Sequence, residues 1–429
     1  MRLLKTKIEG FKNISGTSIS YNHINALVAL NNYGKSNTIH AIDFANAFIQ
    51  GNNKVKSQMM QDRQCIPINN MIAGKNFEFE LTYESLYNEE SYEVNYSFSF
   101  EWIKKGNEGK KITRELLKVK KNEKDSRYTT YINRTGSKNT YQSAKTGRCD
   151  KNIIIDKNAL IVNKLLNFDD LFYLEIIKDL NSLNFSFYSL NDIDRYFSAS
   201  LIVAADKQGK DSDMSEISNI SKRFYLLKED DSDQYNLLIN TIQDLLPDIE
   251  YITPIEIDLK KETEESNGSI MVPFELPEKI YDIRIKIKTN NQETSVKNLS
   301  VGSKRIFYIL LSAIMADMFK CMLLTFEELE NSIHPALLQR LLIVLSDLAP
   351  NTKILITSHS PHMVRYLNVN DILIGVPNQN GISTFAKVKK SKQKKLVRYA
   401  ADAESNIGDF IFDMLIESYY DDSFFNDFI

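Results

Sequence analysis

Hydrophobic and polar positions change their spacing twice within residues 2–49. Residues 2–8 alternate and predict a strand, residues 17–19 predict a second, and the apolar run "INALVAL" at 24–30 predicts a buried strand. Residues 37–49 then carry apolar side chains at helical spacing. The sequence therefore predicts a buried strand that leads through a polar loop into a helix.

Strand patterns dominate residues 76–135. Polar turns separate four stretches, which together predict an antiparallel meander. These stretches are "NFEFELTYE", "YEVNYSFSFEWI", "ITRELLKVKK" and "RYTTYINRT". The polar residues 136–152 that follow are expected to form a mobile loop.

Helical patterns come next, at residues 159–183 and 215–246. Neither keeps a strict heptad over several repeats, so a long coiled coil is not expected. The charged stretches 206–216 and 260–269 are expected to be solvated loops. Helices therefore dominate this middle part of the predicted chain.

The last part of the chain alternates between helix and strand. Strand character returns at 281–288, and the alternation from residue 298 onward is typical of α/β folds. The segment 306–326 is mostly apolar, but Asp317 and Lys320 interrupt it, and a membrane span needs about 20 apolar residues. We expect a buried helix, a short break and a buried strand there, and no membrane partner.

Composition narrows the class of protein. The 429 residues are 43% hydrophobic and 25% charged, as expected for a soluble chain of two or three domains. The net charge of −3 excludes a global polycation, so any contact with DNA needs local basic patches. The N-terminus has no apolar signal core, and the three cysteines (Cys65, Cys149, Cys321) have neither metal-ligand nor disulfide spacing. We therefore expect a cytoplasmic protein.

The polar loop between the first buried strand and helix reads "ALNNYGKSNT". It matches the phosphate-binding pattern G-x-x-x-x-G-K-[ST] except at Ala29. In such a loop Lys35 reaches the β- and γ-phosphates and Ser36 binds Mg²⁺. The alternative is an ordinary turn with Gly34 at a helix start. Asparagines at positions 31 and 32 are suited to supply the left-handed backbone that glycine usually gives.

Two further stretches carry candidate chemistry. "NLSVGSKR" (298–305) precedes a long apolar helix, where Ser300 is a plausible N-cap and Gly302 would allow close approach to a ligand. An ordinary N-cap is the alternative.

"TFEELENSIHP" (325–335) places Glu327 and Glu328 at the end of a buried strand, where one would hold Mg²⁺ and the next would orient water. A solvated acidic turn is the alternative, at a cost in burial.

A fourth stretch, "KILITSHSPHMV" (353–364), ends another buried strand in Ser358 and His359. A histidine at that place can contact a γ-phosphate, although a lone histidine is more often structural. His359 and His362 could also form a metal pair, an interpretation that would require a third, convergent ligand.

Together these stretches resemble the ABC-type ATPase heads of the SMC/RecF group, and more closely the ATPase domains of the OLD family and of anti-phage systems such as Septu and PARIS. "IEGFKNI" (8–14) is similar to the N-terminal turn of SMC heads, and "NLSVGSKR" to the L-S-x-G signature. "FEELENSIHP" and "TSHSPHMV" are similar to the Walker B, D-loop and switch-histidine runs of OLD-like ATPases, and "TRELLKV" to a segment of theirs.

The resemblance implies an α/β P-loop NTPase fold of ABC/SMC-like head type, with a mixed sheet, an antiparallel β meander and a helical insertion. It also implies a homodimer, or a higher oligomer, that closes around ATP and Mg²⁺. Glu328 would be the general base or would position the attacking water. His359 would contact the γ-phosphate, and Ser36 and Glu327 would bind Mg²⁺. ATP would contact Asn32, Gly34, Lys35, Ser36 and Asn37 of one subunit, and Ser300 and Gly302 of the other.

Three departures from the family pattern remove no catalytic side chain: Ala29, Glu327 at the usual aspartate position, and Leu329 in place of proline. Because no catalytic side chain is lost, we expect the protein to hydrolyse ATP, at a slow rate. Residues 331–334 would form the D-loop. The glutamine loop is not placed, and its candidates are Gln58, Gln61 and Gln64.

The motifs divide the chain into three expected domains. Residues 1–155 would form an N-terminal ATPase lobe, 156–280 a helical insertion, and 281–429 a C-terminal lobe with the signature, Walker B and switch histidine. OLD nucleases append a Toprim domain, which we do not expect here because only about 70 residues follow the switch histidine. These residues hold a basic run, 386–398, and an acidic-aromatic tail, 418–429.

The basic run would contact phosphates or be a solvated loop face, and the tail would dock a partner or be a frayed end. The leading hypothesis is an ATPase that senses a cue and regulates a separate effector, a nuclease or toxin, in bacterial anti-phage defence. The alternatives are a RecF/SMC-like ATPase that clamps DNA, and a non-hydrolysing nucleotide-bound scaffold.

Overall fold

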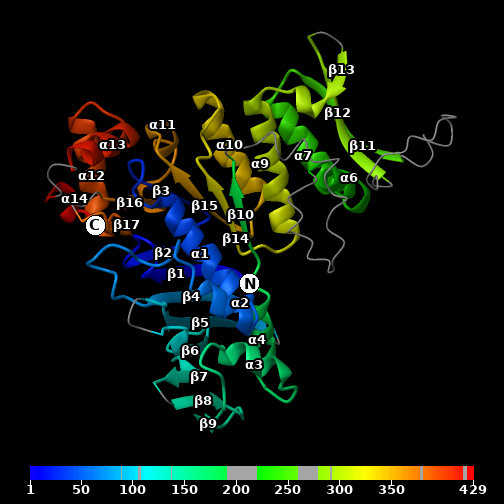
Figure 1. Ribbon diagram of the computed structural model, residues 1–429. Helices are drawn as coiled ribbons and strands as arrows, with labels where there is room; N and C mark the ends of the chain where they lie inside the picture. Colours follow the sequence, from blue (N-terminus) through cyan, green and yellow to red (C-terminus); the bar gives the residue numbers. More distant parts are fainter. Residues whose placement is uncertain are drawn as a thin grey trace. The chain divides into compact units, whose positions relative to one another are not determined.

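The computed structural model describes residues 1–87, 89–104, 108–136, 138–190, 220–258, 279–289, 292–376, 380–418 and 423–429. The chain forms two compact units (Figure 1). Unit 1 consists of Met1–Phe187, Lys320–Glu327 and Asn351–Ile429, and unit 2 of Tyr188–Phe319 and Glu328–Pro350. The three-part division by motifs stays a prediction. The expected loops at 206–216 and 260–269 lie outside the described residues.

The candidate phosphate loop follows a strand of a six-stranded sheet, counted over the described residues, with the order β10-β14-β15-β3-β16-β17. Its strands are β3 (Ile24–Val28), β10 (Phe185–Ser189), β14 (Leu323–Glu327), β15 (Lys353–Ser358), β16 (Ile372–Gly375) and β17 (Phe385–Lys387). Strands β14, β15, β3 and β16 run parallel, and β17 is antiparallel to β16. All five residues of β3 are buried, because a parallel sheet is covered on both faces.

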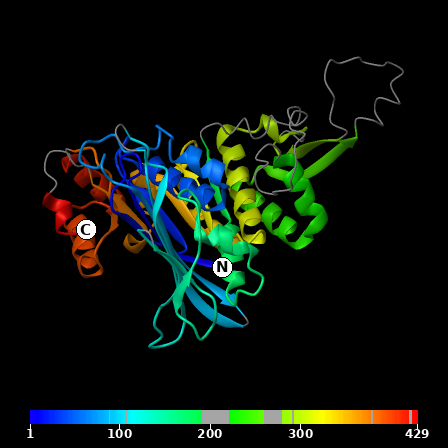
Figure 2. The same ribbon diagram turned by 60° about the horizontal axis from the view of Figure 1, so that its bottom comes forward.

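The second sheet of unit 1 is antiparallel and has, within the described residues, the order β2-β1-β4-β5-β6-β7-β8-β9. Its strands are β1 (Arg2–Glu9), β2 (Thr17–Ser20), β4 (Phe77–Tyr87), β5 (Glu90–Glu101), β6 (Lys111–Lys121), β7 (Thr129–Thr135), β8 (Lys138–Gln142) and β9 (Cys149–Asn152). Its long strands come forward in Figure 2. The predicted meander is confirmed, and with both sheets the expected α/β class with mixed and antiparallel sheets is confirmed.

The expectation of a loop at 136–152 is wrong, because β8 and β9 extend this sheet. The reversal into β8 uses Gly136, whose φ is 63°. The side chain of Gln142 then donates to the carbonyl oxygens of Ala144 and Gly147, at 3.1 and 3.0 Å. Polar residues therefore build this edge of the sheet, and their lack of hydrophobic alternation hid the strands from the sequence analysis.

Helix α1 (Lys35–Gln50) belongs to the hydrophobic core that joins the two sheets of unit 1. The ring of Phe48 stacks on Phe98 and Phe100, with centroids 5.1 and 4.8 Å apart. Phe44 contacts Phe77 and Trp102 in the same cluster. The other helices of unit 1 are α2 (Asn53–Met59), α3 (Ile161–Lys164), η1 (Leu165–Asn167), α4 (Leu174–Asn181), α11 (Pro361–Val364), η5 (Val369–Asp371), α12 (Lys390–Asp402), α13 (Ile407–Glu417) and α14 (Ser423–Asn426).

The single helix expected at 159–183 is divided into α3, η1 and α4. The buried carboxylate of Glu115 accepts hydrogen bonds from the N–H groups of Ile161 and Val162 and fixes the start of α3. Between η1 and α4, Phe168 contacts the ring of Tyr141 and Phe172 that of Tyr131. These tertiary contacts override the helical pattern.

Unit 2 contains α6 (Ile220–Asp230), α7 (Ser232–Leu245), η4 (Val296–Asn298), α9 (Val301–Met318) and α10 (Pro335–Leu348). Its sheet has the order β11-β12-β13, with β11 (Ile249–Asp258), β12 (Lys279–Ile287) and β13 (Gln292–Ser295). The predicted buried helix and strand at 306–326 are confirmed as α9 and β14. The insertion also contributes β11, which holds Pro254 at the edge of its sheet, where a missing N–H is tolerated. None of the described helices has the length and apolarity needed to cross a bilayer.

The end of the chain is folded rather than frayed in its described residues. The basic run lies largely in helix α12, not in a loop. The ammonium group of Lys395 lies over the rings of Tyr399 and Phe428, 5.2 and 5.5 Å from their centroids. Phe425 and Phe428 of the tail are only 1% exposed. The alternative of a frayed end is therefore wrong for residues 423–429.

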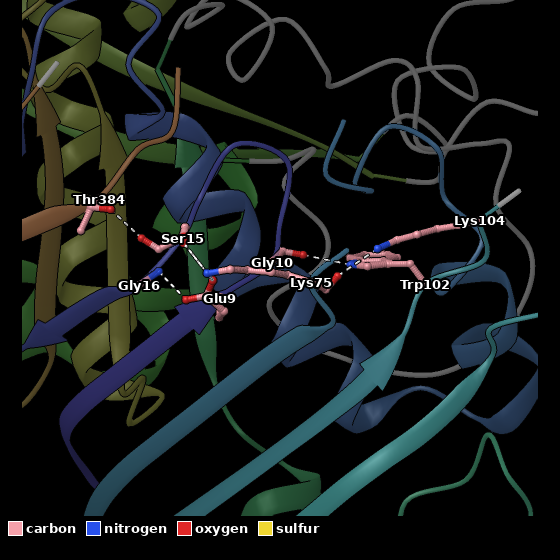
Figure 3. Close-up of polar contacts among 8 residues, drawn as sticks. All are labelled: Glu9, Gly10, Ser15, Gly16, Lys75, Trp102, Lys104 and Thr384. Carbon is pink, nitrogen blue, oxygen red and sulfur yellow. Dashed lines mark hydrogen bonds and ion pairs between the residues drawn. The ribbon is translucent and has the colours of Figure 1, made fainter. Parts of the chain in front are cut away.

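The backbone conformation and close packing of Gly10 predict that a larger residue there destabilises the protein. Its φ is 69°, a Cβ atom there would lie 2.0 Å from the carbonyl oxygen of Asn76, and its own carbonyl accepts a hydrogen bond from the indole of Trp102 (Figure 3). We expect Gly10→Ala to lower the free energy of unfolding by about 2–5 kcal/mol. Gly136→Ala, at a similar φ but with open space, should cost about 1–2 kcal/mol. Thermal melts of both variants measure the difference, and equal losses would contradict the steric account.

Candidate nucleotide-binding site

The candidate site of unit 1 is built on the carboxyl ends of parallel strands. Val28 of β3 lies opposite Ser358 of β15, and Ile356 of β15 lies opposite Phe326 of β14. The phosphate loop, His359 and Glu327 therefore leave the sheet at the same edge. In parallel α/β sheets, that edge is where ligands bind.

The loop itself has the backbone that a phosphate cradle needs. Gly34 is left-handed with φ 91°, and Asn32 is left-handed with φ 62°. The expectation of left-handed geometry is thus confirmed for Asn32 and wrong for Asn31. Helix α1 begins at Lys35 without a side-chain cap and without an acidic residue in its first turn. Its first N–H groups and the positive end of its dipole favour an anion there.

The side chain of Lys35 lies inside the loop. Its ammonium group donates to the carbonyl oxygens of Ala29 and Leu30, at 2.9 and 3.0 Å, and the residue is 7% exposed. Ser36 is exposed at the start of the helix. Ala29 is fully buried and packs beside Gly375, so its methyl group fills core space instead of facing a ligand.

Glu327 fits a cation. One carboxylate oxygen of this half-buried side chain, Oε1, is buried and has no hydrogen-bond partner among the described residues. Burying a carboxylate oxygen in this way is costly unless a cation or donor is near. The hydroxyl of Ser36 and the carboxylate of Glu327 are hard oxygen ligands of the kind Mg²⁺ prefers. These two residues therefore suit the predicted metal role.

His359 is half-buried and directly follows β15. The hydroxyl of Ser358 accepts a hydrogen bond from the N–H of Ser360 at 3.1 Å and shapes the turn. Helix α13 packs closely behind it, because a Cβ atom on Gly408 would lie 2.4 Å from the carbonyl oxygen of Pro361. His362 is exposed, and the described residues contain no group of three His, Cys, Asp or Glu side chains placed to hold a metal.

The signature residues belong to unit 2. Ser300 is exposed and caps α9, with its hydroxyl accepting from the N–H of Ser303 at 3.2 Å. A Cβ atom on Gly302 would lie 2.3 Å from the carbonyl oxygen of Ser332. Gly302 was expected to allow close approach of a ligand. In this chain it allows close approach of the predicted D-loop, whose Ser332 is left-handed with φ 60°.

Glu328 begins a segment of unit 2 and is held by two residues of that unit. Its backbone is left-handed, with φ 49°. Its carboxylate accepts from the side chain of Asn331 at 2.5 Å, and its carbonyl oxygen accepts from Arg305 at 2.7 Å. Burial lowers the pKa of Arg305, while Glu330 and Glu328 oppose that shift. This geometry orients the Glu328 carboxylate.

The structure thus places the predicted residues in two groups. The P-loop, Glu327 and His359 share one edge of the sheet in unit 1, and Ser300, Gly302 and Glu328 lie in unit 2. The sequence analysis missed Arg305, although the quoted signature run contains it. The glutamine-loop candidates Gln58, Gln61 and Gln64 are all exposed, and the described contacts single out none of them.

A helix N-terminus with an uncapped glycine-lysine-serine turn, at the same end of a parallel sheet as a strand-terminal carboxylate, defines a domain of the P-loop NTPase class. Residues 24–365 match the AAA_21 family, described as "AAA domain, putative AbiEii toxin, Type IV TA system". The chain belongs to this family. The matched range starts with β3 and ends just after α11, so it contains all four candidate motifs.

Solved structures of SMC heads are similar to this chain. One is an SMC head bound to the C-winged helix domain of ScpA, with 13% identity and a TM-score of 0.48, covering 92% of this chain and 100% of that one. Another is the SMC head domain from Thermotoga maritima, with 16% identity and a TM-score of 0.43, covering 91% and 100%. No curated protein matches the chain.

The two neighbouring asparagines of the loop differ in backbone conformation, so substitution by glycine should affect them differently. Since Asn32 is left-handed and exposed, Asn32→Gly should raise the free energy of unfolding by up to about 1 kcal/mol. Asn31→Gly, at an exposed position without positive φ, should lower it by about 0.5–1 kcal/mol. Denaturant unfolding of the two variants provides the comparison. Shifts in the same direction would count against the described loop.

Proposed function

We propose that this protein binds ATP with Mg²⁺ at residues 29–37 and hydrolyses it slowly. The observation that carries the proposal is the buried Oε1 of Glu327, which has no hydrogen-bond partner among the described residues and lies at the sheet edge where an uncapped helix begins with Lys35 and Ser36. One end of the parallel sheet thus carries both an anion-binding helix end and a carboxylate suited to a cation. Membership of an AAA-domain family supports the same conclusion.

Each residue then has a defined task. Lys35, whose ammonium now donates to two loop carbonyls, would donate to the β- and γ-phosphates instead. Ser36 and Glu327 would hold Mg²⁺, which when bound neutralises phosphate charge. Glu328, oriented by Asn331, would accept a proton from the attacking water, and His359 would donate to the γ-phosphate.

We further propose that two copies close around ATP, as the resemblance to SMC and OLD-like heads implies. Ser300 is exposed and caps the N-terminus of the 18-residue helix α9, whose positive dipole end would favour a phosphate of a second copy. The Gly302–Ser332 contact would couple this surface to the D-loop of the same copy.

The biological role that we propose is a sensor or regulator of a separate effector in anti-phage defence. The similarity of "FEELENSIHP" and "TSHSPHMV" to the motifs of OLD-like defence ATPases supports it. The family description names a putative toxin of a type IV toxin–antitoxin system. A second candidate is therefore that this chain itself arrests growth, which expression of the chain alone would reveal.

A third candidate is an ATP-dependent DNA clamp of the RecF/SMC type. Helix α12 favours it, because Lys390, Lys394 and Arg398 are exposed at intervals of four residues and so share one face. Binding of the protein to duplex DNA should then weaken steeply with salt. Absence of DNA binding at low salt would exclude this candidate.

The ATPase proposal predicts the effects of two substitutions. Lys35→Ala should weaken ATP binding about 100-fold or more, which corresponds to about 2.7 kcal/mol, because a charge-assisted contact to phosphate is lost. Glu328→Gln should keep ATP affinity and lower kcat at least tenfold. Lys54→Ala, at an exposed lysine of α2, is the control for lost charge. Unchanged binding in Lys35→Ala would refute the site. Unchanged kcat in Glu328→Gln would refute the role of Glu328, and absent or trace hydrolysis that Glu328→Gln leaves unchanged would favour the non-hydrolysing scaffold.

The dimer proposal has its own variant. Ser300→Asp keeps a good N-cap for α9 but places a negative charge where the phosphate of a second copy would lie. ATP-dependent dimerisation, measured by light scattering in the Glu328→Gln background, should be lost while ATP binding persists. Ser143→Asp, at another exposed serine, should dimerise normally. Equal dimerisation of the two variants would contradict the proposal.

A further inference from the structure

Three side chains form a polar relay around the glycine of the phosphate loop. The amide of Asn37 donates to Asn13 Oδ1 at 2.8 Å, and the amide of Asn13 donates to the hydroxyl of Ser383 at 2.8 Å. That hydroxyl donates to the carbonyl oxygen of Tyr33 at 2.6 Å. The relay therefore holds the chain on both sides of Gly34.

Ser383 also packs directly against Gly34 of the loop. It is 0% exposed, and a Cβ atom on Gly34 would lie 2.6 Å from its hydroxyl oxygen and 2.8 Å from its Cβ. Gly34 is thus required by its φ of 91° and by this contact. The hydroxyl of Tyr33 donates to the carbonyl oxygen of Ile382 at 3.2 Å, so the same segment holds the loop twice.

The base of the relay is anchored independently of the loop. The N–H of Ser383 donates to the carbonyl of Asn13 at 2.8 Å, and the N–H of Ser15 donates to the carbonyl of Ser383 at 3.0 Å. The carboxylate of Glu9 accepts from the hydroxyl of Ser15 and the N–H of Gly16, at 2.8 and 2.6 Å (Figure 3). The turn that carries Asn13 is therefore fixed before it touches the loop.

We infer that Asn13 and Ser383 are positioning residues that set the loop for phosphate binding. A planar trans peptide points its C=O and N–H in opposite directions. By holding the carbonyl of Tyr33, Ser383 therefore fixes the direction of the N–H of Gly34, one of the donors of the loop. Asn37, predicted to contact ATP, instead commits its amide to Asn13. The effect of the relay on ATP affinity rests on the proposed ATP-binding function. The hydrogen bonds that hold the loop do not depend on that proposal.

The adjacent residue offers a matched control. Thr384 also donates its hydroxyl to a backbone carbonyl, that of Ser15, at 2.6 Å (Figure 3). That bond joins the same two segments as the relay but does not reach the loop. Thr384→Ala therefore removes a similar hydrogen bond without touching Tyr33 or Gly34.

Hydrogen exchange of the nucleotide-free protein tests the geometry without ATP. Ser383→Ala should speed exchange of the amides of residues 31–38 about 3–10-fold, because a net hydrogen bond of about 1 kcal/mol is lost. Thr384→Ala should change it less than about twofold. If Ser383→Ala leaves this exchange unchanged, the positioning role is overturned, whether or not the protein binds ATP.

The consequence for function is measured with a fluorescent ATP analogue and Mg²⁺. Ser383→Ala and Asn13→Ala should each raise the Kd and KM about 3–10-fold with kcat within about twofold, and Thr384→Ala should not. The double variant should lose less than the product of the single losses, because one relay is broken only once. Faster exchange with unchanged Kd would overturn the claim that the relay sets affinity. A wild-type protein that binds no ATP would instead refute the proposed function, while the exchange result would still decide the relay.

Discussion

The burial of helix α1 in the core shared by the two sheets of unit 1 is the constraint on which the candidate site depends. Phe48 stacks on Phe98 and Phe100 of the antiparallel sheet, and Phe44 makes an edge contact with Phe77, so aromatic contacts fix the second half of the helix. Its first residue then comes to the carboxyl end of β3, where the positive end of the helix dipole favours an anion. The antiparallel sheet, which carries none of the predicted site residues, therefore positions the phosphate loop through the core.

The neighbouring carboxylates of Glu327 and Glu328 are suited to two different roles, binding a cation and accepting a proton. Glu327 ends a segment of unit 1 and Glu328 begins a segment of unit 2. The first has a buried oxygen without a partner among the described residues, which suits a cation. The second has a left-handed backbone and a carboxylate oriented by Asn331, which suits a proton acceptor. The strained backbone of Glu328 is consistent with strain being retained at functional sites.

Local patterns were enough to predict the parts of the fold that hydrophobic burial decides. The run "INALVAL" is buried on both faces, and the helical spacing after it reflects the aromatic face of α1. Strands β8 and β9 were missed, because polar residues such as Gln142 build them through specific hydrogen bonds. The division of α3 from α4 was missed because a distant residue, Glu115, decides where α3 begins. The site shows the same division: Lys35 and Glu327 lie in recognisable motifs, whereas Ser383 meets Asn13 across 370 residues of sequence.

The central claim is that ATP binds at the loop that holds Lys35. The most direct measurement is an experimental structure of the Glu328→Gln protein with Mg²⁺ and ATP. The account predicts the β- and γ-phosphates at the N–H groups of residues 34–36, the metal at Ser36 and Glu327, and Ser300 of a second copy at the same nucleotide. A nucleotide bound elsewhere, or a loop that stays empty at saturating ATP with Lys35 still on the carbonyls of Ala29 and Leu30, would contradict it.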